Sequence, residues 1–562
     1  MSFSDNLIIA PVVLPVIVAG LMLVIDGRSG RITAGLSVGA AFALLAAAVA
    51  LMARAAGGGV QVYQIGNWPS RFGIVLALDR LSAMMLVLTA VLACAALVFS
   101  LARWHKAGSF FHPLFMILLA GLNGAFLTGD LFNLFVFFEI MLAASYGLAL
   151  HGSGHARVKA GLHYVAVNLV ASSAFLIGVS LIYGAAGSLN MADVAARIPR
   201  LDADETRLFQ TGVAILGVAF LVKAAIWPLG FWLPATYAAA GPPVAAMFAI
   251  MTKVGVYAIL RLALLFSPDG STSAVGAGTV LFLGGVITII YGMVGMLASQ
   301  AMARLAGFSV LVSSGTLIAV TGAGNVNVMS ATLYYLFSST MAIAAFFLLV
   351  ELAERGRARS DDVLAVTLEA YGIVYDEDSD DSAEAGVAVP AVLALLGLAF
   401  IACALLMAGL PPLSGFIAKF AMLDALLDQA RNAGDAAGPA WPAWTLVGVL
   451  AVSGLATLIA MTRAGVRTFW PSFEREAPRV SMLEFGPVLV LLALCVGLTI
   501  QAGPAMRFAQ ETTEQLGRRE AYIDSVLAKP VAVRQDQAAG AAPGTGPAAP
   551  RARDTGKGGA AR

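Results

Sequence analysis

Long apolar segments separated by short polar loops run through most of the chain. A helix that spans a bilayer needs roughly 20 mostly apolar residues, and about fourteen segments meet that requirement. The predicted spans are residues 7–25, 32–53, 75–101, 111–128, 131–150, 161–183, 208–227, 244–266, 276–298, 305–322, 328–350, 389–428, 443–463 and 482–503. This pattern predicts an all-α polytopic membrane protein.

Two of these spans, the seventh and the twelfth, are interrupted by helix-breaking residues. The predicted break and hinge positions are Pro228, Pro234, Pro411, Pro412 and Gly415. Proline removes a backbone donor and ends or kinks a helix. Broken backbone at membrane depth is tolerated only inside protein or beside a water-filled cavity. We therefore expect residues 229–243 to be irregular or to form a half-helix that re-enters the bundle.

Composition agrees with this assignment. The chain has 562 residues, of which 59% are hydrophobic and only 12% are charged, whereas a soluble domain has about 25% charged residues. Lysine and arginine concentrate in the loops after the odd-numbered spans, which places the N-terminus and, with an even number of spans, the C-terminus outside the cell. Cys94, Cys403 and Cys495 lie in separate apolar runs and indicate packing rather than a metal site. No nucleotide-binding or redox motif is recognisable, so we expect no cofactor and no nucleic-acid partner.

Four ionisable residues fall inside predicted spans: Glu139, Lys223, Lys253 and Lys419. A charged side chain at the centre of a helix in a bilayer costs about 2.5–3.5 kcal/mol on insertion scales. Lys223 and Lys419 both belong to broken helices that lie five helices apart, a pattern typical of internal repeats in transporters. Structural ion pairs are the alternative interpretation. We interpret the four groups as a proton relay, because a buried lysine can exchange its proton near neutral pH.

Further polar residues that carry no permanent charge occur in the sixth and eleventh spans. The candidates for relay or water-path lining are His163, Asn168, Tyr334, Ser338 and Ser339. Hydrogen bonding between helices is the alternative role for such residues. Asp79 and Arg80 are adjacent at the start of the third span, and this placement favours an interfacial anchor over a relay.

Two regions are predicted to lie outside the bilayer. Residues 353–386 carry an acidic run from Asp376 to Glu384 and are expected to form a solvated loop. Residues 505–530 are a candidate amphipathic helix, followed by a disordered tail rich in Ala, Gly and Pro. We divide the chain into N-terminal helices (1–110), a first repeat (111–270), a second repeat with the loop (271–465), a last helix (466–505) and a polar, largely disordered tail (506–562).

The segments FFEIMLAASYGL, KAAIWPLGFWLPATYAAAGPPVAA, MTKVGVYAILR and GLPPLSGFIAKF resemble the antiporter-like membrane subunits of respiratory complex I, membrane-bound hydrogenases and Mrp (Mnh/Pha) multisubunit antiporters. The resemblance covers about residues 70–505 and is greatest to the D-type subunits of the Mrp antiporters. It implies fourteen helices with two inverted five-helix repeats, helices 4–8 and 9–13. It also implies that Glu139 pairs with Lys223, that Lys253 is the central lysine, and that Lys419 is the lysine at the far end.

Two positions depart from the pattern of this family. Gly230 replaces the histidine of the PLHxWLP segment in many respiratory relatives, and Ser338 replaces a histidine of helix eleven. The implied function is proton translocation in a Na⁺ or K⁺/H⁺ antiporter of the bacterial inner membrane, with a second large antiporter-like subunit and several small membrane subunits as partners. The alternatives are a proton-pumping subunit of a complex I-like dehydrogenase or hydrogenase, and a scaffold that only assembles the complex.

Overall fold

Helices form nearly all of the chain that the computed structural model describes. The described residues are 6–25, 30–68, 70, 73–108, 110–152, 154–267, 277–324, 326–371, 391–431, 440–469 and 480–528. In this part of the chain, twelve helices are long and apolar enough to cross a membrane, and Ala10–Ile25 and Phe111–Leu127 are shorter apolar helices. The predicted class, a polytopic helical membrane protein, is confirmed.

The helices follow the predicted spans closely, with additional short helices between them. The first group comprises α2 (Ala10–Ile25), α3 (Gly30–Ala56), α4 (Arg80–Ser100), α5 (Phe111–Leu127), α6 (Leu131–Ala149), α7 (His155–Ala186), α8 (Met191–Arg197), α9 (Ala203–Lys223), α10 (Leu233–Ala239) and α11 (Pro242–Phe266). The second group comprises α12 (Ala277–Ala298), α13 (Met302–Ala323), α14 (Val326–Tyr371), α15 (Ala391–Ala408), α16 (Ser414–Arg431), α17 (Trp441–Phe469), α18 (Met482–Ile500), α19 (Ala502–Gly517) and α20 (Arg519–Leu527).

The expectation of purely α-helical structure misses a small antiparallel sheet. Strand β1 (Gln61–Gln64) pairs with β2 (Val75–Leu78), so residues 75–78 are strand rather than the first turn of the third span. The cause is the capping box at Asp79, whose carboxylate accepts a hydrogen bond from the backbone N–H of Ser82. A cap of this kind fixes the start of a helix, which here places the first residue of α4 at Arg80.

Two regions predicted to lie outside the bilayer contain helices: the predicted loop over 353–386, and residues 505–530, for which an amphipathic helix was the expectation. α14 has 46 residues and continues to Tyr371, so the predicted loop over 353–386 begins as helix. Residues 353–371 contain many helix-favouring residues, which explains the continuation. The predicted tail from residue 506 begins with α19 and α20, which extend to Leu527. The acidic run and residues 529–562 lie outside the described residues.

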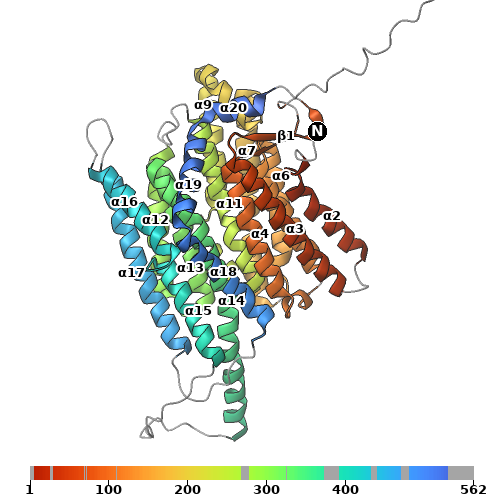
Figure 1. Ribbon diagram of the computed structural model, residues 1–562, viewed down its shortest axis with the longest axis vertical. Coiled ribbons are helices and arrows are strands. Elements are labelled where there is room, and N and C mark those ends of the chain that lie inside the picture. Colours follow the sequence, from red (N-terminus) through yellow and green to blue (C-terminus); the bar gives the residue numbers. More distant parts are fainter. Residues whose placement is uncertain are drawn as a thin grey trace, which may run out of the picture. The chain divides into compact units, whose positions relative to one another are not determined.

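The helices divide into a buried centre and a periphery. The apolar stretches of α4, α11, α13 and α14 are at least 83% buried, whereas those of α3, α9 and α15 are 33% buried. Figure 1 shows α11 and α13 in the middle of the bundle, with α2 and α3 on one side and α16 and α17 on the other. A charged residue on a central helix is therefore enclosed by protein, and one on α9 or α16 lies nearer the perimeter.

One end of the bundle is covered by the β1–β2 sheet, α8 and α20, and we call it the hairpin end (Figure 1). The hydroxyl of Ser70, between the two strands, donates to the carbonyl oxygen of Val526 in α20 over 2.6 Å. The side-chain amide of Asn190, which caps α8, donates to the carbonyl oxygen of Ser70 over 3.0 Å. These bonds join segments that are far apart in sequence. Loop charges predict that this end faces the outside of the cell.

Candidate functional site

Glu139 on α6 and Lys223 on α9 meet through a serine of α7. The hydroxyl of Ser172 donates to the carboxylate of Glu139, and the ammonium group of Lys223 donates to the same hydroxyl oxygen over 3.3 Å. Lys223 is 5% exposed and also lies 6.0 Å from the ring centre of Phe138. The structure therefore brings the two predicted relay residues into one group, in which Ser172 lies between the opposite charges.

The backbone breaks directly after Lys223, which is the last residue of α9. α10 forms the short re-entrant helix in this connection, and Pro234 lies in its first turn. A Cβ atom added at Gly230 would lie 2.1 Å from the carbonyl oxygen of Ala225, so the turn leaves no room for a side chain at this position. In this chain, the close approach restricts position 230 to glycine.

Lys253 is enclosed completely by protein on α11, with 0% of its surface exposed. Its ammonium group donates to Ser313 over 2.9 Å and to Ser314 over 3.1 Å, both on α13. The hydroxyl of Ser313 lies 3.1 Å from that of Ser339 on α14. Neutral hydroxyl groups, rather than a carboxylate, therefore surround the central ammonium group.

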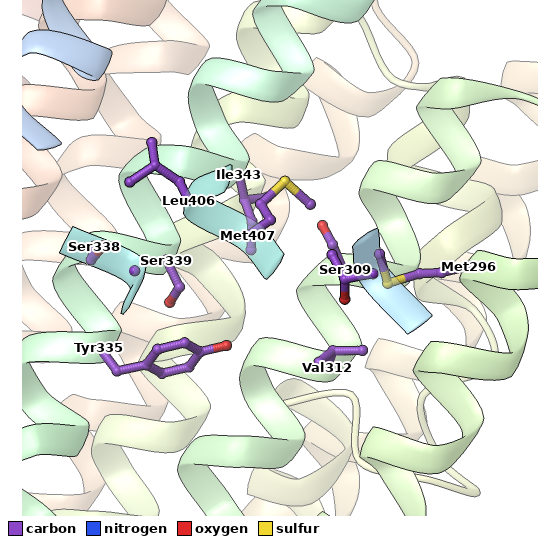
Figure 2. Close-up of a pocket in the computed structure, with 11 residues that line it drawn as sticks. Met296, Ser309, Val312, Tyr335, Ser338, Ser339, Ile343, Leu406 and Met407 are labelled. Atoms are coloured by element: carbon purple, nitrogen blue, oxygen red, sulfur yellow. The ribbon is translucent and has the colours of Figure 1, made fainter. Parts of the chain in front are cut away.

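A small cavity continues this hydroxyl network toward α15 and α16. Figure 2 shows Tyr335, Ser338 and Ser339 on one side of the cavity and Ser309 and Val312 of α13 on another. The cavity has about 20 Å³ of space for the centres of water molecules. One buried water needs about 10–15 Å³ of such space, so the cavity has room for a water molecule. Water there would link hydroxyl groups that make no direct contact.

Lys419 lies beyond the cavity on α16, the second half of the twelfth predicted span. Its ammonium group donates to the backbone carbonyls of Ala408 over 2.9 Å and Met407 over 3.2 Å, at the end of α15. The break between α15 and α16 frees these carbonyls, because the last carbonyls of a helix have no partner within it. Ser414, the first residue of α16, lies 2.8 Å from Ser338, and the break thus also adjoins the cavity.

The five candidates for relay or water-path lining do not all lie near the lysines. Ser338 and Ser339 line the cavity. Asn168 is buried one turn before Ser172 on α7 and donates to the carbonyl of Tyr164. His163 is exposed on α7, where its ring bonds to the carbonyl of Lys159, and Tyr334 donates to Leu498 of α18. The structure therefore does not bring His163 and Tyr334 together with the lysines.

The serines that contact the lysines were not predicted from the sequence. Ser172 contacts Lys223, Ser313 and Ser314 contact Lys253, and Ser414 connects the break to the cavity. A signal was present: adjacent serine pairs occur in three apolar spans, at 172–173, 313–314 and 338–339. Each pair has at least one member in the polar path. In the described residues, no group of three or more His, Cys, Asp or Glu could hold a metal ion.

Within the part of the chain described, the polar path is interrupted between its first and second lysines. The first cluster ends at Lys223 and the second begins at Lys253, and no hydrogen bond between described side chains joins them. The backbones of α9 and α11 nevertheless approach closely: a Cβ atom added at Gly255 would lie 2.7 Å from the backbone nitrogen of Ala224. Proton transfer between these two lysines therefore requires water or a side-chain movement.

Known proteins are similar to this chain over nearly its whole length. The family model described as "NADH:quinone oxidoreductase/Mrp antiporter, TM" matches residues 128–435. A probable D-type subunit of a K⁺/H⁺ antiporter from Rhizobium meliloti is 56% identical over 94% of this chain and 99% of the relative. The D-type subunit of a Na⁺/H⁺ antiporter from Alkalihalophilus pseudofirmus is 31% identical over 93% of this chain and 99% of the relative.

Solved structures of related complexes contain chains with the same fold. A chain of the Mrp complex from Dietzia sp. DQ12-45-1b superposes with a TM-score of 0.79 at 26% identity, covering 94% of this chain and 100% of that chain. The family match includes the region that holds Glu139, Lys223, Lys253 and Lys419. The chain belongs to the NADH:quinone oxidoreductase/Mrp antiporter family, on the branch of the Mrp D-type subunits.

Proposed function

We propose that this chain moves protons within a multisubunit Na⁺ or K⁺/H⁺ antiporter of the bacterial inner membrane. The observation that carries the proposal is the bonding of the three buried lysines. Their ammonium groups donate to hydroxyl or backbone carbonyl oxygens: Ser172 for Lys223, Ser313 and Ser314 for Lys253, and Met407 and Ala408 for Lys419. A neutral partner does not hold a lysine permanently in its charged form, as a direct carboxylate partner would.

The proton path follows the order of these groups across the bundle. Glu139 acts on Lys223 through Ser172, so a change in the charge of one alters the free energy of the other. A proton passes from Lys223 to Lys253, then through the serine cluster and the cavity to Lys419. Hydroxyl groups and water both donate and accept hydrogen bonds, which suits them to this transfer.

The partners follow from the same assignment. The relatives are named as D-type subunits of antiporters, and the similar solved chain comes from an Mrp complex. This chain therefore works beside other subunits, in which we include a second large antiporter-like subunit and small membrane subunits. Lys419 on α16 and Glu139 on α6 lie at opposite sides of the lysine series, where charge changes in neighbouring subunits would act on them.

The Lys223→Ala variant tests the relay. We expect the complex to assemble and cation/proton exchange in inverted membrane vesicles to be lost. The matched control is Lys159→Ala, which removes an exposed lysine from the neighbouring helix α7 and should leave exchange unchanged. Wild-type exchange in Lys223→Ala, with the variant chain present in the complex, contradicts the relay.

A second candidate function is supported by the family itself, because its description also names NADH:quinone oxidoreductase. In that case the same lysines would work in a pump driven by electron transfer in neighbouring subunits. Purification of the complex from its own membranes separates the two functions. Iron–sulfur or flavin subunits support the pump, and a second large antiporter-like subunit with small membrane subunits supports the antiporter.

A further inference from the structure

A buried ion pair lies on the same helix as Lys253, toward the hairpin end. Arg261 of α11 donates to both carboxylate oxygens of Asp79, over 2.7 and 2.9 Å, and the two side chains are 6% and 3% exposed. Asp79 also accepts the capping hydrogen bond from the backbone of Ser82 over 2.8 Å. Asp79 and Arg80 were expected to form an interfacial anchor together, but Asp79 is buried and pairs with Arg261, whereas Arg80 pairs with Glu511.

Two tyrosine rings enclose this guanidinium group. Its central carbon lies 5.0 Å from the ring centre of Tyr257 and 5.5 Å from that of Tyr522 in α20. The hydroxyl of Tyr257 donates to the carbonyl of Phe126 on α5 over 2.7 Å, which fixes its ring. Cation–π contacts of this kind strengthen when water is excluded. Arg261 is consequently held by three separate segments: the start of α4, its own helix and the C-terminal helix α20.

Space for water adjoins the pair on its hairpin side. A cavity lined by Asp79, Arg261, Gln515, Arg519 and Tyr522 has about 20 Å³ of space for water centres. The buried Nε of Arg261 has no hydrogen-bond partner among the described residues, and a water molecule in this cavity would supply one. Water thus has a place beside the guanidinium group, between α11 and the helices α19 and α20.

The chemistry of this site differs from that of the relay. A guanidinium group is not deprotonated in proteins, so Arg261 cannot pass a proton on. The oxygens of Asp79 are occupied by Arg261 and Ser82. Arg261 follows Lys253 by two turns of α11, about 12 Å along the helix axis. Asp79 balances the charge of Arg261, but the pair offers no step for a proton: the guanidinium group has no acceptor, and it holds the carboxylate in its ionised form. Removal of Arg261 would leave the buried carboxylate unpaired and able to accept a proton.

We propose that Arg261, fixed by Asp79 and Tyr522, is a proton barrier that closes the hairpin end of α11. It prevents a proton on Lys253 from passing directly to that side of the membrane, so that the proton continues to Lys419. Arg261 is therefore a positioning residue that confines the path and does not carry the proton. This inference rests on the relay under "Proposed function".

The test measures passive proton flux through the purified whole complex in proteoliposomes, with a pH-sensitive dye inside and no exchangeable cation present. We expect Arg261→Gln to raise this flux about tenfold, the effect of one unit charge about 12 Å away at an effective dielectric constant near 20. Arg261→His should also raise it, because an imidazole can take up and release a proton near neutral pH. The added flux should disappear when Lys253→Ala is combined with either substitution.

Arg197→Gln is the matched control, since it breaks another arginine–aspartate pair at the hairpin end, with the buried Asp193 over 2.8 Å. Its flux should equal that of the wild type. Wild-type flux in Arg261→Gln and Arg261→His overturns the barrier, and so does added flux that persists without Lys253. If Arg261→Gln does not assemble, Arg261→His decides the question alone. Failure of the relay is a separate result, because Lys253→Ala alone would then retain full exchange.

Discussion

The ammonium nitrogen of Lys253 lies 2.9 Å from the hydroxyl oxygen of Ser313. A hydroxyl group accepts a hydrogen bond from an ammonium group and donates one to a neutral amine. This contact therefore persists whichever charge state Lys253 has, and only the direction of the hydrogen bond changes. The rotation of one hydroxyl group, which also lies 3.1 Å from Ser339, then transmits the charge state toward the cavity.

The first prediction concerns the serine pair that contacts Lys253. The double substitution Ser313→Ala/Ser314→Ala removes both hydrogen-bond acceptors of Lys253, and an unpaired buried group costs about 1–3 kcal/mol, more when it is charged. We expect exchange in inverted vesicles to fall about tenfold or more, with assembly retained. Ser453→Ala on α17 is the control, because Ser453 is buried and bonds to Leu450 of its own helix. Equal rates in both variants would show that the serines only fill space.

The second prediction concerns the break before Lys419. A Cβ atom added at Gly415 would lie 2.0 Å from the carbonyl oxygen of Leu406, and backbone cannot move aside cheaply. Gly415→Ala should therefore lower the thermal stability of the complex and slow exchange. Gly448→Ala on α17, where no atom lies within 4 Å of the added Cβ, should be neutral or slightly stabilising. A wild-type melting temperature for Gly415→Ala would contradict the tight packing.

The third prediction concerns the attachment of α20. Arg519 donates to the carbonyl of Ser267, after α11, and to that of Ala195 in α8, each over 3.0 Å. Hydrogen bonds from a charged group contribute roughly 1.5–3 kcal/mol each, so Arg519→Ala should destabilise the hairpin end measurably. Faster hydrogen exchange in α20 would report this change. Arg518→Ala, at the exposed neighbouring position, should leave exchange protection as in the wild type.

The fourth prediction concerns the pH dependence of stability. Burial raises the pKa of Asp130, the cap of α6, from 3.8 to about 6, against the lowering effect of hydrogen bonds from the backbone of Asn133 and Phe132. The folded protein thus binds this proton more tightly than the unfolded chain. The contribution of Asp130 to stability is therefore greatest below pH 3.8 and is lost as pH rises through about 6.

Thermal unfolding of the purified complex between pH 4 and pH 7 tests this sign. Asp130→Asn keeps a good helix cap and removes the titrating group, so its melting temperature should decline less over this range than that of the wild type. The control is Asp202→Asn, which changes the exposed cap of α9 and should preserve the wild-type slope. A wild-type slope in Asp130→Asn would contradict the assignment.

Much of the fold and the main site residues are readable from the sequence, because the bilayer imposes simple rules. Apolar length fixes most helices, and the cost of burying a charge singles out Lys223, Lys253 and Lys419. Proline and glycine locate the breaks beside Lys223 and Lys419. The structure places all three lysines in buried positions with polar contacts. Their role as a relay stays a prediction until the variants are measured.

Other features depend on contacts that no local pattern reveals. Ser172 and Ser313 resemble ordinary interhelical serines in sequence, and only the packing of α7 and α13 places them against lysines. The partner of Asp79 is Arg261, 182 positions away, although Arg80 is its sequence neighbour. His163 has a chemically suitable side chain, but it lies on the exposed face of α7. The type of a residue indicates which contacts it can make, and the direction of its side chain in the folded protein determines which of them it does make.

The two carbonyl acceptors of Lys419 have a consequence for how this protein can change during evolution. The acceptors belong to the main chain at Met407 and Ala408, so no substitution of those two side chains deletes them. The bonding of Lys419 therefore depends on the shape of the break and not on the identity of those two side chains. Mutational sensitivity should thus concentrate at Gly409, whose φ of 78° and closeness to Lys419 exclude larger residues. The lysine site is encoded in part by backbone geometry.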